Sequence, residues 1–331
     1  MERIGIFGAG TWGLALARML YNNGNEVTVW SSDPAKAETL SRVRAVDRLP
    51  NMVLPEGIRF TGDIAEGCRA ADIAVLAVAS VYIRETARRM APYLDSDPIA
   101  VIVAKGIEAD TLMTLSEVVR SEAGERVRIV ALSGPTHAEE VAVDLPSTIV
   151  AASRDPSAAE KVQQVFSCSV MRTYTNSDIL GVELCGALKN IIALATGMSA
   201  GLGYGDNTKA ALITRGLAEI ERLGRKMGCR PETFRGLAGM GDLIVTATSS
   251  HSRNNNCGRL IGQGLSVQEA VKEVGMVVEG IHAIPAAIAL ADKYGVEMPI
   301  IRAVDGIVNH GRSPKETVAY LMGRDYKTEL M

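Results

Sequence analysis

The 331-residue chain contains few cysteines, few aromatic residues and no excess of charge of one sign. Its five cysteines form no CxxC pair and are odd in number, which argues against a disulfide framework and against a zinc site. Its 35 basic and 38 acidic residues are interspersed, so no broad cationic field is available to attract a nucleic-acid backbone. We therefore expect a reducing, cytoplasmic environment, no nucleic-acid partner and no metal.

Long uninterrupted apolar runs are also missing. The first strand begins by Arg3, which leaves no room for a signal peptide, and the longest weakly polar stretch carries Lys189 and several glycines. We expect no membrane span. Apolar residues nevertheless make up 47% of the chain, and its length favours two domains, each with a core of its own.

The N-terminal half alternates short apolar runs with helical patterns. The apolar runs are RIGIF, NEVTVW, ADIAVLAVAS, PIAVIVAKG and RVRIVALSGP. Such nearly unbroken runs are typical of a parallel sheet that is covered on both faces. STIVAAS and VMRTYT are two further candidate strands, with a helix predicted between them. The pattern predicts an α/β domain with a mostly parallel sheet over residues 1–185.

Beyond Asn176 the spacing of apolar residues is helical. The segment DLIVTAT, residues 242–248, is the one later stretch that could form a strand. The sequence thus predicts an all-α C-terminal domain over residues 186–331, with the boundary inside a helix.

Three glycines follow the first strand in the order GxGxxG, and the third opens a helix. Gly8 permits the tight turn, Gly10 lets the backbone approach a pyrophosphate, and Gly13 allows close packing of the helix on the strand. The helix N-terminus favours anionic oxygens. This context predicts that residues 1–185 form a dinucleotide-binding domain of the Rossmann type.

The second strand should end beside the adenosine ribose. There, an acid favours NAD by accepting from the 2′-hydroxyl, and an arginine favours NADP. The strand ends at Trp30, followed by Ser31, Ser32 and then Asp33, an acid slightly late in position and without an arginine beside it. The cofactor is therefore NAD or NADP, with the preference open.

Two lysines are candidates for chemistry. Lys105 follows the apolar run IAVIVA directly, so its ammonium could polarise a carbonyl at the nicotinamide end of the cleft, or it is an exposed turn residue. Lys189 is the one basic residue between Arg172 and Lys209. It either extends its head to water, or it is removed from water and serves proton transfer. Cys185 in the same helix is better read as a buried, inert thiol.

A later segment could hold a phosphate group. Asp242 follows a flexible turn, and Ser252, Arg253 and Asn254 stand at a plausible helix start. A helix N-terminus with an adjacent guanidinium suits a terminal phosphate dianion. The alternative is an ordinary polar loop with an N-cap.

Across its whole length the chain resembles the bacterial NAD(P)-dependent sn-glycerol-3-phosphate dehydrogenases. The resemblance is carried, in order, by GAGTWGLALA, VAKGIE, SGPTHAEE, GVELCGALKN, GMGDLIVT and SRN. It implies a Rossmann-type domain followed by an all-helical domain. It also implies interconversion of dihydroxyacetone phosphate and sn-glycerol 3-phosphate with NAD or NADP, for phospholipid synthesis.

The resemblance also implies roles for individual residues. The catalytic residues would be Lys189 as proton donor and acceptor, Lys105 as a contact to cofactor and substrate, and Asp242 as the carboxylate that positions substrate and Lys189. The substrate contacts would be Lys105, Gly134, Thr136, Lys189, Asp242, Ser252, Arg253 and Asn254. The cofactor contacts would be Gly8, Gly10, Thr11, Trp12, Gly13, Ser32, Lys105, Ala138, Arg253, Val277 and Glu279.

One departure from the family pattern concerns the cofactor. Many members carry histidine or arginine at the positions of Ser31 and Ser32, so a preference for NADP is in doubt. The alternatives to this function are a 3-hydroxyacid or 6-phosphogluconate-type dehydrogenase, and a non-catalytic NAD(H)-sensing protein. A homodimer is compatible with the sequence but not specified by it.

Overall fold

The chain forms two compact units in the computed structural model, which describes residues 1–69, 71–94, 97–326 and 328–329. The sheet unit comprises Met1–Gly186 and Cys229–Asp242, and the helical unit comprises Ala187–Gly228 and Leu243–Met331. The spacing of apolar residues does not predict that Cys229–Asp242 belongs with the N-terminal part. The domain roles predicted for residues 1–185 and 186–331 stay predictions.

The sheet unit is built on eight strands in the order β3-β2-β1-β4-β5-β6-β7-β8. The strands are β1 (Arg3–Phe7), β2 (Glu26–Trp30), β3 (Arg59–Thr61), β4 (Ile73–Leu76), β5 (Ile99–Ile102), β6 (Arg128–Ser133), β7 (Ser147–Ala152) and β8 (Met171–Asn176). Neighbouring strands are parallel except β6 and β7, which are antiparallel. The prediction of a mostly parallel sheet is confirmed.

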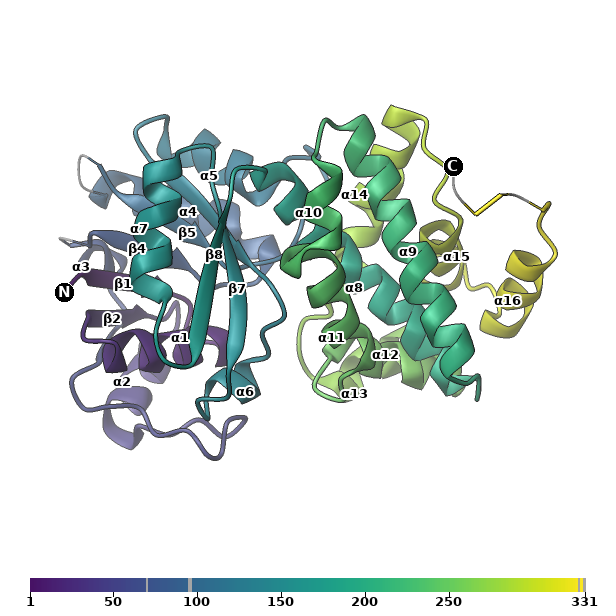
Figure 1. The fold of residues 1–331 in the computed structure, drawn as a ribbon. Coiled ribbons are helices and arrows are strands. Elements are labelled where there is room, and N and C mark those ends of the chain that lie inside the picture. Colours follow the sequence, from purple (N-terminus) through teal and green to yellow (C-terminus); the bar gives the residue numbers. More distant parts are fainter. Residues whose placement is uncertain (70, 95–96, 327, 330–331) are drawn as a thin grey trace. The chain divides into compact units, whose positions relative to one another are not determined.

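Helices cover both faces of this sheet, which explains the unbroken apolar strands. The helices of the unit are α1 (Thr11–Asn22), α2 (Pro34–Val43), α3 (Ile64–Cys68), α4 (Ile83–Met90), α5 (Leu115–Ala123), α6 (Ala138–Val141), α7 (Pro156–Phe166) and α10 (Pro231–Arg235). One core lies under α1 and α7, the other under α3, α4 and α5. Figure 1 shows α7 beside β8, which it contacts.

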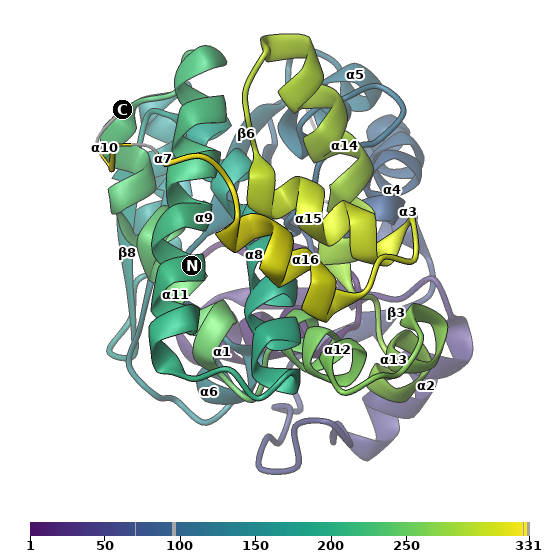
Figure 2. The same ribbon diagram turned by 90° about the vertical axis from the view of Figure 1, so that its right-hand side faces the viewer.

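The helical unit contains α8 (Ile179–Gly201) from Ala187 onward, α11 (Asp242–Thr248) from Leu243 onward, and six complete helices among its described residues. The six are α9 (Asp206–Lys226), α12 (Arg253–Gly262), α13 (Val267–Val274), α14 (Glu279–Tyr294), α15 (Pro299–Val308) and α16 (Pro314–Met322). α15 contacts α9, α14 and α16, and Figure 2 shows α15 and α16 side by side.

α8 is the one helix in the described residues that is long and apolar enough to cross a membrane by length and composition. Of its most apolar 18-residue window, 89% is buried within the structure. A mostly buried helix of this kind is what the core of a folded protein contains, so its apolar character has an explanation without a membrane.

The strand considered for DLIVTAT is wrong, because these residues form α11. Leu243 and Ala247, four positions apart, are buried, whereas Ile244 is 45% exposed. This is helical spacing, but a run of six apolar and hydroxyl residues after Asp242 is too short for periodicity to separate a helix from a strand. The π-helical turn η3 (Leu237–Gly241) leads directly into α11. This turn is closely packed at Gly239, where a Cβ would lie 2.1 Å from the Phe234 carbonyl oxygen.

Candidate active site

The turn after β1 has the backbone geometry that GxGxxG predicts. Gly8 adopts a φ of +128°, and a Cβ there would lie 2.6 Å from the carbonyl carbon of Ala77. A Cβ on Gly13 would lie 2.2 Å from the Gly8 carbonyl oxygen. Both positions therefore require glycine, the first for the turn and the second for the close approach of α1.

Gly10 differs, because no heavy atom lies within 4 Å of the position where its Cβ would be. It is the N-cap of α1, and in the described part of the chain no acceptor contacts the first-turn amides of Thr11 and Trp12. Such amides, at the positive end of the helix dipole, bind phosphate oxygens. The turn thus offers the open space and the donors that the pyrophosphate of NAD or NADP requires.

The end of β2 is occupied by local structural contacts. Trp30 is buried, and its indole nitrogen donates to the Gly62 carbonyl over 3.1 Å. The Asp33 carboxylate caps α2 by accepting from the amides of Ala35 and Lys36 at 3.0 and 3.3 Å. Ser32 is exposed. The acid that could have signalled NAD is therefore a helix cap, so its presence in the sequence does not decide the cofactor.

Within the sheet unit, Lys105 and Asp242 form a partly buried ion pair. The Lys105 ammonium lies 2.5 Å from Asp242 Oδ2 and donates to the Gly134 carbonyl over 3.3 Å. The Ser133 hydroxyl donates to the same Asp242 oxygen over 3.3 Å. The side chain of Lys105 is 19% exposed and that of Asp242 only 2%. Lys105 is thus a partnered lysine rather than an exposed turn residue.

The sheet topology explains why these groups meet. β5 and β6 are parallel neighbours, so Lys105, three residues beyond β5, and Gly134, directly after β6, lie at the same edge of the sheet. Thr136 Oγ1 donates to the Gly134 carbonyl over 3.3 Å, which adds a fourth predicted site residue to the cluster. The structure therefore brings together Lys105, Gly134, Thr136 and Asp242.

In the helical unit, Lys189 does not extend its head to water. It is 5% exposed, and its ammonium donates a short hydrogen bond to the hydroxyl of Thr246 in α11, which is also 5% exposed. Of the two readings of this lysine, burial of the ammonium is the one that the structure supports.

The first turn of α12 gathers the three predicted phosphate contacts. Ser252 is the N-cap, and its hydroxyl accepts from the Asn255 amide over 3.2 Å. Arg253 is exposed, and its guanidinium donates to the Val277 carbonyl over 3.2 Å. Asn254 is 8% exposed and is hydrogen-bonded through its side chain. Ser252 therefore opens a helix, as the sequence predicts.

The remaining predicted cofactor contacts lie at helix starts. Ala138 is the first residue of α6, in the sheet unit. Glu279 is the first residue of α14, in the helical unit, and Val277 lies two residues before it. The Arg253 guanidinium contacts the Val277 carbonyl oxygen, and the cofactor roles of Ala138 and Glu279 stay predictions.

Sequence reasoning missed Ser133, Asn190 and Thr246, each of which contacts a predicted site residue. Thr246 would have been found if α11 had been predicted as a helix, since Thr246 stands one turn after Asp242. Ser133 ends β6, and Asn190 follows Lys189 directly. Cys185, in contrast, is the inert thiol expected: burial raises the pKa of its thiol well above the usual value, so it is no nucleophile.

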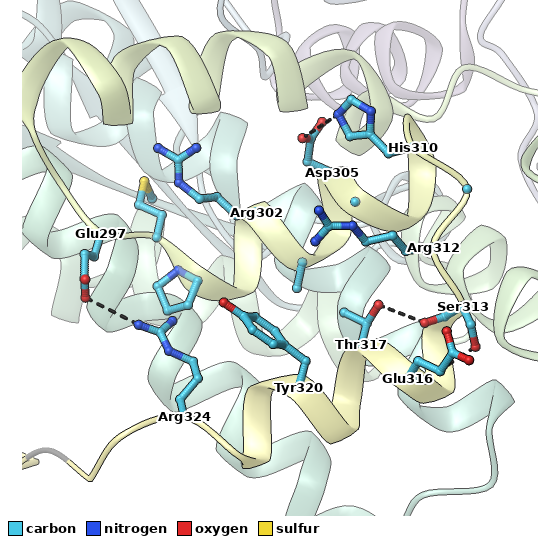
Figure 3. A pocket seen from close by; sticks show the side chains of 15 residues that line it. Glu297, Arg302, Asp305, His310, Arg312, Ser313, Glu316, Thr317, Tyr320 and Arg324 are labelled. Atoms are coloured by element: carbon cyan, nitrogen blue, oxygen red, sulfur yellow. Dashed lines mark hydrogen bonds and ion pairs between the residues drawn. The ribbon is translucent and has the colours of Figure 1, made fainter.

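A separate pocket of about 720 Å³ lies in the helical unit, along α15 and α16 (Figure 3). Its charged side chains are mostly paired: His310 with Asp305 at 3.3 Å, and Arg324 with Glu297 at 3.5 Å. None of the predicted site residues is among the described residues that line it. This pocket therefore shares no residue with the Lys105–Asp242 cluster or with the first turn of α12.

The glycine turn, the doubly covered parallel sheet and the buried lysine of a helical unit define an NAD(P)-dependent dehydrogenase of the Rossmann type. A family model for the N-terminus of NAD-dependent glycerol-3-phosphate dehydrogenase matches residues 3–159, and one for its C-terminus matches residues 178–319. The chain belongs to the NAD-dependent glycerol-3-phosphate dehydrogenase family. The predicted resemblance is confirmed, and NAD or NADP is the cofactor.

Individual relatives match over nearly their whole length. The chain is 61% identical to glycerol-3-phosphate dehydrogenase [NAD(P)+] 2 of Lactobacillus delbrueckii subsp. bulgaricus, covering 100% of this chain and 99% of that one. It is 48% identical to the Bacillus subtilis enzyme of the same name, covering 100% and 96%. The crystal structure of glycerol-3-phosphate dehydrogenase from Coxiella burnetii superposes with a TM-score of 0.94 at 37% identity, covering 98% and 99%. These relatives favour this family over the 3-hydroxyacid and 6-phosphogluconate-type alternative.

Proposed function

We propose that Lys189 donates and accepts the proton as this enzyme interconverts dihydroxyacetone phosphate and sn-glycerol 3-phosphate for phospholipid synthesis. The bound reduced nicotinamide supplies the hydride that reaches C2 of dihydroxyacetone phosphate. The Lys189 ammonium donates a proton to the developing alkoxide oxygen, and neutral Lys189 takes it back in the reverse reaction. The observation that carries this role is the burial of the Lys189 ammonium, which is held by the Thr246 hydroxyl.

Lys105 and Asp242 are proposed to fix charge around the substrate. The Lys105 ammonium is held by Asp242 Oδ2 and the Gly134 carbonyl, so its position is set before the reaction begins. A preorganised cation stabilises negative charge that develops on the substrate oxygen without reorganising. Asp242 orients this ammonium.

The first turn of α12 is proposed to hold the substrate phosphate. In the described residues no acceptor contacts the amides of Arg253 and Asn254, and the ten-residue helix contributes the positive end of its dipole. The Arg253 guanidinium adds a charge-assisted contact. These groups are suited to a phosphate monoester dianion.

The cofactor is proposed to bind at the glycine turn, with NADH favoured over NADPH. The amides of Thr11 and Trp12 would hold the pyrophosphate. At the end of β2, Ser31, Ser32 and Asp33 include no basic side chain to hold a 2′-phosphate. A higher kcat/KM for NADPH than for NADH would overturn this preference.

The phosphate role is tested by replacing Arg253 with alanine. Loss of a charge-assisted hydrogen bond should raise the KM for dihydroxyacetone phosphate by about 10-fold to 100-fold, since such bonds contribute about 1.5–3 kcal/mol. NADH oxidation, followed at 340 nm, gives both kinetic constants. The activity of Arg253→Ala with unphosphorylated dihydroxyacetone should equal that of the unmodified enzyme, because this substrate carries no phosphate.

The matched control is Arg259→Ala, an exposed arginine of the same helix. An unchanged KM in Arg253→Ala would contradict the phosphate role. No NADH oxidation by the unmodified protein would instead favour an NAD(H)-sensing protein without turnover.

The surroundings and assembly of the enzyme are also proposals. We propose a cytoplasmic enzyme without a membrane span, and the burial of α8 within the structure supports the absence of a span. A homodimer is tested by light scattering of the purified protein, in which a mass of one chain would exclude it.

A further inference from the structure

We propose that Ser133 is a positioning residue of the reaction, whose hydroxyl holds the Asp242 carboxylate in the orientation that aims the Lys105 ammonium at the substrate. The inference rests on the proposed role of the Lys105–Asp242 pair. It extends that role to a third side chain, which acts on the substrate through the pair. All three residues belong to the sheet unit.

Two donors converge on one oxygen of Asp242. Its Oδ2 accepts from the Lys105 ammonium over 2.5 Å and from the Ser133 hydroxyl over 3.3 Å. Asp242 is buried, and Ser133 is 4% exposed. A buried carboxylate and a buried hydroxyl both need hydrogen-bond partners inside the protein, because water does not reach them. Each of the two groups is a partner for the other, so the direction of the Ser133 hydroxyl is set.

The backbone on both sides of this hydrogen bond is fixed by the sheet. Ser133 is the last residue of β6 and is opposite Val150 of the antiparallel strand β7. Asp242 follows η3, which contacts β7. A Cβ at Gly241 in this turn would lie 3.7 Å from Cγ of Pro135. The carboxylate can therefore turn only through the side-chain torsions of Asp242, and the Ser133 hydroxyl opposes that rotation.

Gly186 of α8 gives the Lys105 stem and the Ser133 hydroxyl a common surface. A Cβ at Gly186 would lie 3.2 Å from Ser133 Oγ and 3.3 Å from Lys105 Cγ. These distances are shorter than ordinary van der Waals contact, so both side chains pack against the bare backbone of this glycine. The stem of Lys105 is thus held in place, and the direction of its ammonium is left to the Asp242 carboxylate.

The consequence concerns the third donor of this ammonium. A lysine ammonium carries three N–H groups, and among the described residues Asp242 Oδ2 and the Gly134 carbonyl take two of them. The third is suited to the substrate oxygen on which negative charge develops. Rotation of the carboxylate would move the ammonium with it, and an error of about 1 Å can cost about 100-fold in rate.

The test is a double-mutant cycle of Ser133→Ala and Asp242→Ala in the full-length enzyme, measured as kcat/KM for dihydroxyacetone phosphate. Ser133→Ala should lower kcat/KM by about 10-fold in the wild-type background, the weaker end of the range for a hydrogen bond to a charged group. In the Asp242→Ala background the same change should cost less than about twofold, because the hydroxyl acts through the carboxylate that is missing there. NADH oxidation at high enzyme concentration keeps slow variants measurable.

Two results of this cycle would overturn the proposal. Equal losses in the two backgrounds would mean that the Ser133 hydroxyl acts by a route other than Asp242. A loss of less than about twofold in the wild-type background would mean that it positions nothing. If Asp242→Ala does not fold, Lys105→Met serves as the background. The Ser133 effect should disappear there too, since the carboxylate acts through that ammonium.

The matched control is Ser153→Ala. Ser153 is a buried serine of the same sheet unit, and its hydroxyl donates to the Ile129 carbonyl over 2.7 Å. Its kcat/KM should be unchanged, and a loss equal to that of Ser133→Ala would mean a general effect of removing a buried hydroxyl. If Lys105→Met and Asp242→Ala leave kcat/KM unchanged, the proposed role of the pair is wrong. If both lower it and Ser133→Ala does not, the role of Ser133 alone is wrong.

Discussion

Glycine has opposite uses in two regions of the molecule, at Gly10 in the turn after β1 and at the contact between α8 and α12. At Gly10, in the sheet unit, the space that a side chain would take is empty. At Gly197 and Gly258, in the helical unit, that space is filled by the backbone of the facing helix. The first glycine leaves room for a ligand, and the other two allow helices to touch. Replacement of glycine by alanine should therefore affect cofactor binding at Gly10 and folding at Gly197 and Gly258.

The two units share one device, a buried glutamate that accepts from the start of a neighbouring helix. In the sheet unit, Glu183 accepts from the amide and the hydroxyl of Ser116, at 2.7 and 2.6 Å. In the helical unit, Glu219 accepts from the amides of Ile300 and Ile301, at 2.8 and 3.2 Å. Burial raises the pKa of each carboxyl from 4.5 to about 7.

The largest expected effect on stability is the pH dependence due to these two glutamates. Between pH 4.5 and 7 the folded protein holds a proton that the unfolded chain has released, so stability falls as pH rises through this range. At about 1.4 kcal/mol per pH unit, each glutamate accounts for about 3 kcal/mol. Chemical denaturation at pH 5 and 7.5 should show this loss reduced in Glu183→Gln and in Glu219→Gln. Equal pH slopes in wild type and variants would contradict it.

Next in size is the effect of Gly258→Ala, at the contact between α12 and α8. The added Cβ would lie 2.2 Å from the Leu194 carbonyl oxygen, so the two helices must separate. Overpacking of this kind costs about 1–3 kcal/mol. The free energy of unfolding measures it. Gly205→Ala, at the open N-cap of α9, is the control and should be near neutral; equal losses in both variants would break the comparison.

A smaller effect on binding is expected for Gly10→Ala. The φ and ψ at Gly10, −82° and 174°, suit alanine, and its Cβ would enter open space, so the thermal midpoint should not change. The KM for NADH should rise by about 10-fold, because the added methyl group occupies the place of the pyrophosphate. A lowered midpoint with an unchanged KM would show that this glycine serves packing, as in the helical unit.

Residues set by a local sequence pattern could be predicted, whereas contacts between distant helices could not. Gly8, Gly10 and Lys105 were predictable because a local pattern fixes each one at the end of a strand. The Gly197–Asn255 and Gly258–Leu194 backbone contacts, the Lys189–Thr246 contact and the Asn254–Asn190 hydrogen bond join residues that are 57–64 positions apart on different helices. No local spacing encodes such contacts.

Two features of the fold escaped prediction for related reasons. The antiparallel pairing of β6 and β7 escaped prediction because their connection, residues 134–146 with the helix α6, is long enough for a crossover between parallel strands. The strand β3 has only three residues, too few to show alternation. Asp242 was singled out although its helix was not recognised, because its motif and not its secondary structure marked it.

The central claim is that one buried ammonium, that of Lys189, transfers the proton in the reaction. The most direct measurement is the kcat of Lys189→Met for dihydroxyacetone phosphate and NADH, with Lys209→Met of α9 as the control. General acid catalysis contributes about 100-fold to 10,000-fold, so kcat should fall by at least that factor while the affinity for NADH stays nearly unchanged. A Lys189→Met enzyme that turns over at a rate close to that of the control would contradict the account.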